Sequence, residues 1–140
     1  MTGIYNLRVV TDFASAHTLA GYPGACARMH GHNWKVEAEV EATTLDDIGM
    51  AIDFKEIKRV AREIAGELDH RYLNELPAFA DRNPTAEHIA RWFFEEMERR
   101  LARPGVRMAA LTLWETERAC VRYSRRAGAS DIEPDVENKN

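Results

Sequence analysis

Several features that mark other protein classes are scarce or missing in this chain of 140 residues. Its two cysteines, Cys26 and Cys120, are too few for a disulfide framework, which favours a reducing compartment and a free thiol. No apolar run approaches the ~20 residues of a membrane span, and the N-terminal residues lack a signal-peptide pattern. The formal net charge of −4 gives no basis for binding nucleic acid or anionic membranes. We therefore expect a cytoplasmic protein with neither of those partners.

The composition indicates one folded domain and a short tail. Hydrophobic residues make up 45% of the chain and charged residues 30%, as in soluble globular proteins, and the length suits a single core. After Arg126 the sequence GASDIEPDVENKN is polar, acidic and unpatterned. We expect a domain over residues 1–126 and a disordered tail over residues 127–140.

Hydrophobic periodicity predicts an α+β fold of the order ββααββ, with four antiparallel strands and two helices on one face. Trp34, Val36, Ala38 and Val40 alternate with charged residues, which is typical of a half-buried strand. The polar side of that strand suits solvent or the interior of an oligomeric barrel. Cys120 falls in an apolar run and is expected in the core. The expected strands are 4–13, 32–43, 107–114 and 120–123; one helix is expected from Asp53 to Leu68, and another from Asn83–Pro84 to just before Pro104.

Three of the five histidines, His17, His30 and His32, lie in one stretch around a glycine-containing loop. Side chains alternate in an extended chain, so His30 and His32 can point the same way, and a hairpin would bring His17 beside them. Imidazole is the commonest side-chain metal ligand. Three ligands and an open position are typical of catalytic zinc, whereas four ligands are typical of structural zinc. Cys26, four residues before His30, can be either a bystander or the fourth ligand.

Other candidate residues lie at the ends of the predicted elements. Asp69 and His70 end the first helix, where they form either an acid–base pair or a cation favoured by the helix dipole. Glu115 ends the third strand and suits either a pocket rim or an ordinary turn. Thr85 and Glu87 belong to the start of the second helix.

Several motifs occur together in a specific order: F-A-S-A-H, C-A-R-M-H-G-H, I-D-F, L-D-H-R-Y-L-N, N-P-T-A-E and W-E-T. With them, about residues 4 to 125 resemble the 6-pyruvoyl-tetrahydropterin synthase family, and most closely its bacterial branch that forms 6-carboxy-5,6,7,8-tetrahydropterin for queuosine synthesis. Three residues separate Cys26 from His30, which is similar to that branch. The resemblance implies the T-fold, a barrel of three subunits paired into a hexamer, and active sites between subunits.

The resemblance also implies a role for each candidate residue. His17, His30 and His32 match the zinc ligands, and Cys26 matches the proton-abstracting base. His70 matches a second acid–base group that Asp69 orients. Glu115 matches the residue that anchors the pterin ring, with weaker support for Thr85, Glu87 and Thr116 in the same pocket. The implied substrate is 7,8-dihydroneopterin triphosphate, whose phosphates are expected to meet scattered basic residues such as Arg28.

Two alternatives remain at this stage. The first is the pyruvoyl-forming reaction, in which triphosphate leaves but the side chain keeps its three carbons. The second is a non-catalytic binding module, in which zinc closed by three histidines and Cys26 only stabilises the fold.

Overall fold

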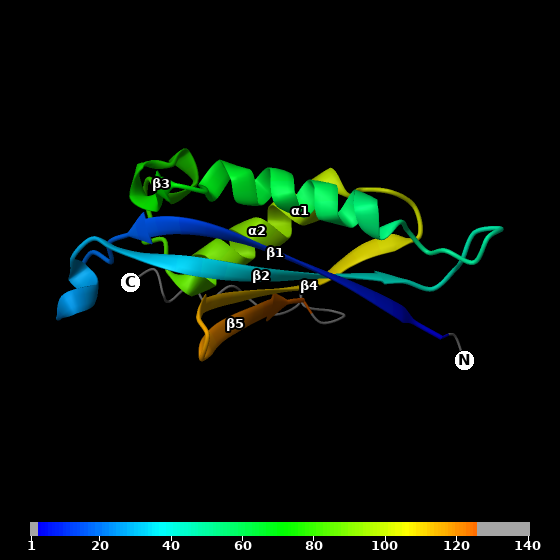
Figure 1. The fold of residues 1–140 in the computed structure, drawn as a ribbon, viewed down its shortest axis with the longest axis horizontal. Helices are drawn as coiled ribbons and strands as arrows, with labels where there is room; N and C mark the ends of the chain where they lie inside the picture. Colours follow the sequence, from blue (N-terminus) through cyan, green and yellow to red (C-terminus); the bar gives the residue numbers. More distant parts are fainter. Residues whose placement is uncertain (1–2, 126–140) are drawn as a thin grey trace.

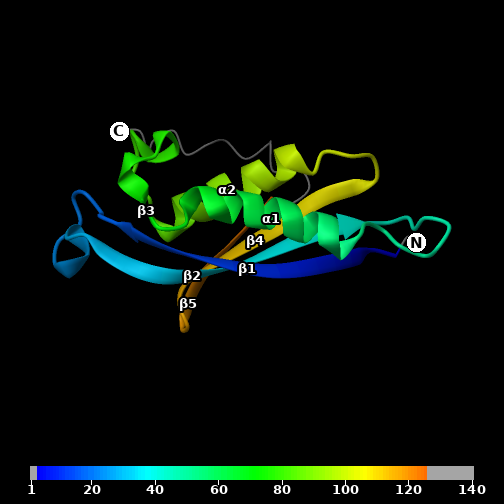
Figure 2. The same ribbon diagram turned by 45° about the horizontal axis from the view of Figure 1, so that its top comes forward.

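In the computed structural model, which describes residues 3–125 apart from the side chain of Cys26, a five-stranded sheet carries both helices on one face (Figures 1 and 2). The predicted tail over 127–140 lies outside the described residues. Across the sheet the strand order is β3-β1-β2-β4-β5. The elements are β1 Tyr5–His17, β2 His30–Ala42, α1 Phe54–Leu68, β3 Arg71–Tyr72, α2 Ala86–Arg100, β4 Val106–Thr116 and β5 Ala119–Ser124, with short 3-10 turns at Ala25–Ala27, Leu73–Glu75 and Pro77–Phe79.

The β1–β2 hairpin is the longest feature of the sheet. Its two strands pair antiparallel from Tyr5 opposite Ala42 to His17 opposite His30. The predicted alternation in β2 is confirmed, since Trp34 and its apolar partners at every second position are buried under the helices. Both strands run further toward the connecting loop than predicted. As a result, His17 and His30 face each other at the end of the sheet.

The two helices cover the same sheet face, as predicted. In α1 the Asp53 side chain accepts a hydrogen bond from the Lys55 amide at 2.8 Å and caps the helix. Phe54, the first residue of the helix, is 51% exposed. The predicted start of α2 at Asn83 is wrong, because Thr85 caps that helix by accepting from the His88 amide at 3.1 Å. Within residues 3–125, no helix combines the length and apolarity needed to cross a membrane.

The sheet differs from the prediction by one short strand. After α1 the backbone of His70 adopts a left-handed conformation, with φ of 57°, and β3 then runs parallel to β1. A non-glycine residue is uncommon in this region, so single-sequence patterns did not predict the turn. The prediction for Cys120 is also wrong: it is exposed, because β5 presents Val121 and Tyr123 to the helices and Cys120 to the open face.

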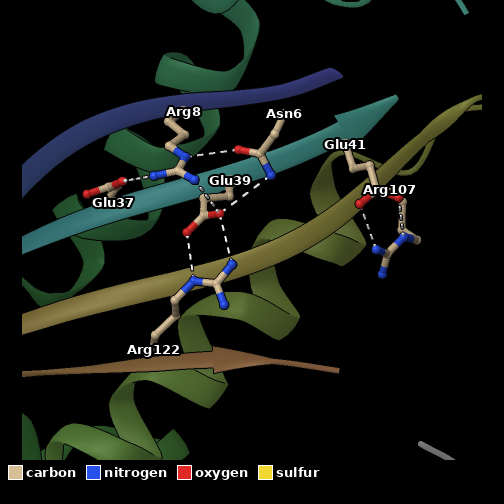
Figure 3. A network of polar contacts seen from close by, with 7 residues as sticks. All are labelled: Asn6, Arg8, Glu37, Glu39, Glu41, Arg107 and Arg122. Carbon is tan, nitrogen blue, oxygen red and sulfur yellow. Dashed lines mark hydrogen bonds and ion pairs between the residues drawn. The ribbon is translucent and has the colours of Figure 1, made fainter. Parts of the chain in front are cut away.

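The open face of the sheet carries a ladder of ion pairs (Figure 3). Arg122 reaches from β5 across β4, where only Ala110 stands opposite Glu39, and holds the Glu39 carboxylate with two hydrogen bonds of 3.0 Å. Arg8 approaches Glu39 from β1 at 3.6 Å. Glu39 is only 2% exposed. The hydrogen bonds from Arg122 lower the pKa of Glu39 below its usual value, despite the opposing effect of burial.

Replacing Glu39 by glutamine should lower the free energy of unfolding by about 2–4 kcal/mol, because Arg122 loses the carboxylate that neutralises it and Arg8 loses one of its two partners. Since the folded pKa is lowered, this stabilisation is complete above the ordinary value of 4.5 and disappears as pH falls through the folded pKa. Urea unfolding at pH 7 measures the loss. Glu41→Gln is the control, because its pair with Arg107 is more exposed and should contribute less than about 1 kcal/mol. Equal losses in both variants would contradict the prediction.

Candidate metal and pterin site

The three predicted histidines meet at the end of the β1–β2 hairpin. His17 is the last residue of β1 and His30 the first of β2, and His32 points to the same face as His30. The ring centroids lie 4.5 Å apart for His17 and His30, 5.3 Å for His17 and His32, and 5.0 Å for His30 and His32. The hairpin register therefore brings together residues that the sequence separates by a loop.

Backbone carbonyls fix the tautomers of two of the rings. Nδ1 of His17 lies 2.8 Å from the Pro84 carbonyl oxygen, and Nδ1 of His30 lies 2.7 Å from that of Arg28. A carbonyl only accepts, so each Nδ1 carries the proton and each Nε2 keeps a lone pair. Metal-binding histidines are commonly oriented by this kind of contact.

The chemistry of the cluster fits a cation. His17 is fully buried, and Nε2 of His17 and of His32 are buried without a hydrogen-bond partner within the described residues. Burial lowers the pKa of both rings below 6.5, which favours the neutral form that binds metals. Buried polar atoms without partners are costly. The residues thus form a site that could hold a metal ion.

Glu115 joins this cluster from β4. Its Oε2 atom lies 3.4 Å from Nε2 of His32 and 3.5 Å from Nε2 of His17. One ligand atom from each of His17, His30, His32 and Glu115 lies within 4.8 Å of the others. The family resemblance implied that Glu115 anchors the substrate ring; the structure puts its carboxylate at the edge of the histidines.

Asp69 and His70 form a hydrogen-bonded pair on the outer side of β1. Oδ2 of Asp69 lies 2.8 Å from Nδ1 of His70, while Oδ1 accepts the Ala14 amide at 2.8 Å. The His70 amide donates to the Ala14 carbonyl, which holds the left-handed turn in place. The bond from Ala14, and then that with His70, lower the pKa of Asp69. The carboxylate thus stays charged and orients an imidazole that is largely exposed.

One cavity borders a member of each group. It has a volume of about 480 Å³ and is bordered by small residues of β1 and β2, by His32, and by the turn that carries His70. A ligand in this cavity can therefore contact His32 and His70, whereas His17, His30 and Glu115 do not line it.

Comparison with known proteins identifies the family. The family model described as 6-pyruvoyl tetrahydropterin synthase matches residues 6–126. The chain belongs to the 6-pyruvoyl tetrahydropterin synthase family. A putative 6-carboxy-5,6,7,8-tetrahydropterin synthase of Archaeoglobus fulgidus is 34% identical over 109 residues, which cover 78% of this chain and 86% of that protein. A dihydroneopterin monophosphate aldolase of Pyrococcus furiosus is 39% identical over 88 residues, covering 62% and 70%.

Solved structures agree on the fold of this tetrahydropterin synthase family member. The Caenorhabditis elegans 6-pyruvoyl tetrahydropterin synthase superposes with a TM-score of 0.79 at 23% identity, covering 89% of this chain and 98% of that one. The predicted T-fold, with both helices on one side of the sheet, is thereby confirmed. The oligomeric barrel stays a prediction.

The remaining predicted residues of the synthase-family site are placed less centrally. The backbone of Cys26 lies in the turn Ala25–Ala27, and its side chain is outside the described part of the chain. Thr85 caps α2, and Glu87 is exposed in the first turn of that helix. Thr116 ends β4, where its hydroxyl oxygen accepts the Arg118 amide at 3.1 Å. None of the three weaker candidates belongs to the histidine cluster.

Two asparagines that position the cluster were missed. Asn74 exchanges two hydrogen bonds of 2.9 Å with the backbone of Thr18, and Asn83 does the same with Ala20. They fix the chain as it leaves His17. Both asparagines lie in motifs that also predict turns or helix caps. The sequence alone therefore did not show that their side chains hydrogen-bond to the backbone after His17.

Proposed function

We propose that this chain is a zinc-dependent lyase that converts 7,8-dihydroneopterin triphosphate to 6-carboxy-5,6,7,8-tetrahydropterin, with release of acetaldehyde and triphosphate, for queuosine or deazapurine synthesis. The observation that carries the proposal is the trio of converging imidazoles beside a cavity, two of which, His17 and His32, have buried Nε2 atoms without a hydrogen-bond partner among the described residues. Membership of a tetrahydropterin synthase family, with relatives named for the carboxy product, supports the substrate class.

In this proposal His17, His30 and His32 hold the zinc. Zinc, when bound, supplies a Lewis acid that acidifies the C–H protons next to the substrate hydroxyls. The preset tautomers of His17 and His30 mean that little reorganisation precedes metal binding. Glu115, which we propose as the pterin anchor, can accept two parallel hydrogen bonds from the ring and its amino group.

Two groups of the chain move protons in the proposal. Cys26 acts as the base; a free cysteine thiol has a pKa of about 8.5, so a nearby cation must favour its thiolate. His70 serves as the second acid–base group, and its hydrogen bond to Asp69 fixes the ring so that Nε2 exchanges the proton. The substrate side chain reduces its own ring, so no redox cofactor takes part. One carboxylate oxygen of the product must come from water, since C1′ of the substrate carries only one.

We also propose that the active form is a hexamer of paired trimers. On its outer side β1 pairs with β3 at Ser15 and Ala16, and Ala14 is bonded to Asp69 and His70, so residues 5–13 leave an unpaired strand edge among the described residues. Unpaired edges favour strand pairing between copies.

Product analysis tests the proposed reaction. The zinc-loaded protein is incubated with 7,8-dihydroneopterin triphosphate, and the products are identified by mass. We expect acetaldehyde and the carboxypterin in equal amounts. A pyruvoyl compound that retains all three side-chain carbons would instead establish the synthase reaction of the family name.

A second candidate is favoured by the 39% identity to the monophosphate aldolase. An aldolase would cleave the side chain of dihydroneopterin monophosphate, leave a hydroxymethyl group on the ring and keep the phosphate ester intact. The same mass analysis, repeated with the monophosphate, separates the two reactions.

A further inference from the structure

A notch opens between β2 and β4 directly beside the histidine cluster. The ladder between these strands ends at Lys35 opposite Trp114. Beyond that pair β2 continues toward His30 along β1, whereas β4 continues to Thr116 along β5. The two strands therefore separate at the end of the sheet. A cavity of about 190 Å³ fills the opening, and its lining residues are Asn33, Lys35, Trp114, Thr116 and Glu117.

The notch and the histidine rings lie at the same end of the sheet but on opposite faces, since Asn33 and Lys35 alternate with His32 and Trp34 along β2. Asn33 follows His32 in β2, and Thr116 follows Glu115 in β4. With a rise of about 3.3 Å per strand residue, the notch is on the order of 10 Å or less from the histidines. Two larger cavities, of about 480 and 620 Å³, also include Asn33 and extend to His70. The smaller of these two also borders His32, so a ligand at the end of the sheet can contact His32 and extend along the open face into the notch.

The notch carries an unneutralised cation. On the same sheet face, Arg8, Arg107 and Arg122 each pair with a glutamate of β2. Lys35 does not: within residues 3–125 no carboxylate lies within 4.0 Å of its ammonium group, which sits 5.4 Å from the centre of the Trp114 ring. Asp12 stands opposite Lys35 in β1, and Glu117 lines the cavity, but neither forms an ion pair with it.

The residues that line the notch also carry hydrogen-bond donors. Nε1 of Trp114 is buried without a partner among the described residues. The Thr116 oxygen accepts from the Arg118 amide, so its proton is available to donate, and the Asn33 amide adds two more N–H groups. The Glu117 carboxylate also lines the notch, but a compact cation and neutral donors in the same cavity suit phosphoryl oxygens, which form strong charge-assisted hydrogen bonds.

We infer that the notch is a subsite for the phosphate groups of the substrate, with the Lys35 ammonium as its cation. This inference rests on the proposed function and extends it, because it names the groups that select a phosphorylated pterin. A neutral pterin ring binds only weakly to an ammonium group, whereas a phosphate oxyanion forms a charge-assisted hydrogen bond with it. The paired arginines of the open face have no comparable freedom to bind an anion.

Binding of oxidised, unreactive ligands tests the inference without turnover. Neopterin triphosphate and neopterin are titrated into the zinc-loaded protein by pterin fluorescence, and inorganic triphosphate is used as a competitor. Lys35→Met keeps the alkyl stem but removes the charge. The substitution should lower the affinity for neopterin triphosphate and for inorganic triphosphate about 10- to 100-fold, as expected for the loss of one charged hydrogen bond. The affinity for neopterin should change by no more than about twofold.

Lys58→Met is the matched control, since Lys58 is exposed on α1 away from the notch. It should leave all three affinities unchanged. The inference is overturned if Lys35→Met lowers the affinities for neopterin and its triphosphate equally, or changes neither. It is also overturned if the loss of triphosphate affinity appears in Arg28→Met instead. If the wild-type protein binds neither pterin, the proposed function itself fails, and that outcome is distinct from the others.

Discussion

Replacing His17 by alanine should abolish stoichiometric metal binding and lower turnover of the pterin substrate by at least about 10³-fold. His17 is the most buried of the three rings, and it couples the cluster to the start of α2 through the Pro84 carbonyl. Its loss removes one of three metal ligands and leaves a buried carbonyl without its donor. Mutation of a group that only orients a metal ligand already lowers metal affinity or activity by about 10- to 100-fold. Loss of a ligand itself should therefore lower them further. Metal content after dialysis and steady-state kinetics measure the two effects.

Loss of folding could imitate that result, so a second variant is needed. His32→Ala removes a ring that is part-exposed and makes no hydrogen bond to the backbone, and it should lose metal while keeping a cooperative unfolding transition. His88→Ala is the control, because His88 lies at the start of α2 and contacts Asn83 rather than the cluster. Full metal content in His32→Ala, or equal loss in His88→Ala, would contradict the assignment of the ligands.

Replacing Cys26 by alanine should lower turnover by about 10²- to 10⁴-fold, the range expected for loss of a general base, and leave the zinc content at one per chain. The reason is the role proposed for the thiol, which removes a proton near the metal but does not bind the metal. Single-turnover kinetics and metal analysis of the same preparation measure both quantities. This prediction separates the catalytic hypothesis from the structural one.

The opposite pattern would support the zinc-stabilised binding module. In that case Cys26→Ala would lose zinc and unfold, because the metal would be closed by four protein ligands. Cys120→Ala is a matched control, since Cys120 is exposed on β5, outside the cluster. It should retain zinc, activity and stability. An effect in Cys120→Ala as large as that in Cys26→Ala would show that the loss is not specific to the proposed base.

The sequence alone predicted the central geometry because strand periodicity is a strong constraint. Alternation in β2 places His30 and His32 on one face together with Trp34, and a hairpin register then requires His17 to meet them. The amphipathic stripe of α1 likewise predicted a helix that buries one side against the sheet. These features depend on local patterns that persist over many residues.

The features that were missed depend on tertiary contacts. Glu39 has the pattern of an exposed strand residue, and its burial follows from Arg122 of β5 reaching over Ala110. The parallel strand β3 depends on the left-handed turn at His70, which the backbone of Ala14 stabilises from a distant strand. The proximity of Glu115 to the histidines depends on how β4 leaves β2. None of these contacts has a signature within a short window of sequence.

Zinc K-edge X-ray absorption of the zinc-loaded protein tests the central claim most directly. An open site held by three imidazoles predicts nitrogen and oxygen neighbours at about 2.0–2.1 Å and no sulfur. A sulfur neighbour at about 2.3 Å in the active protein would show that Cys26 closes the site. That result would contradict both the open position for the substrate and the role of the thiol as a base.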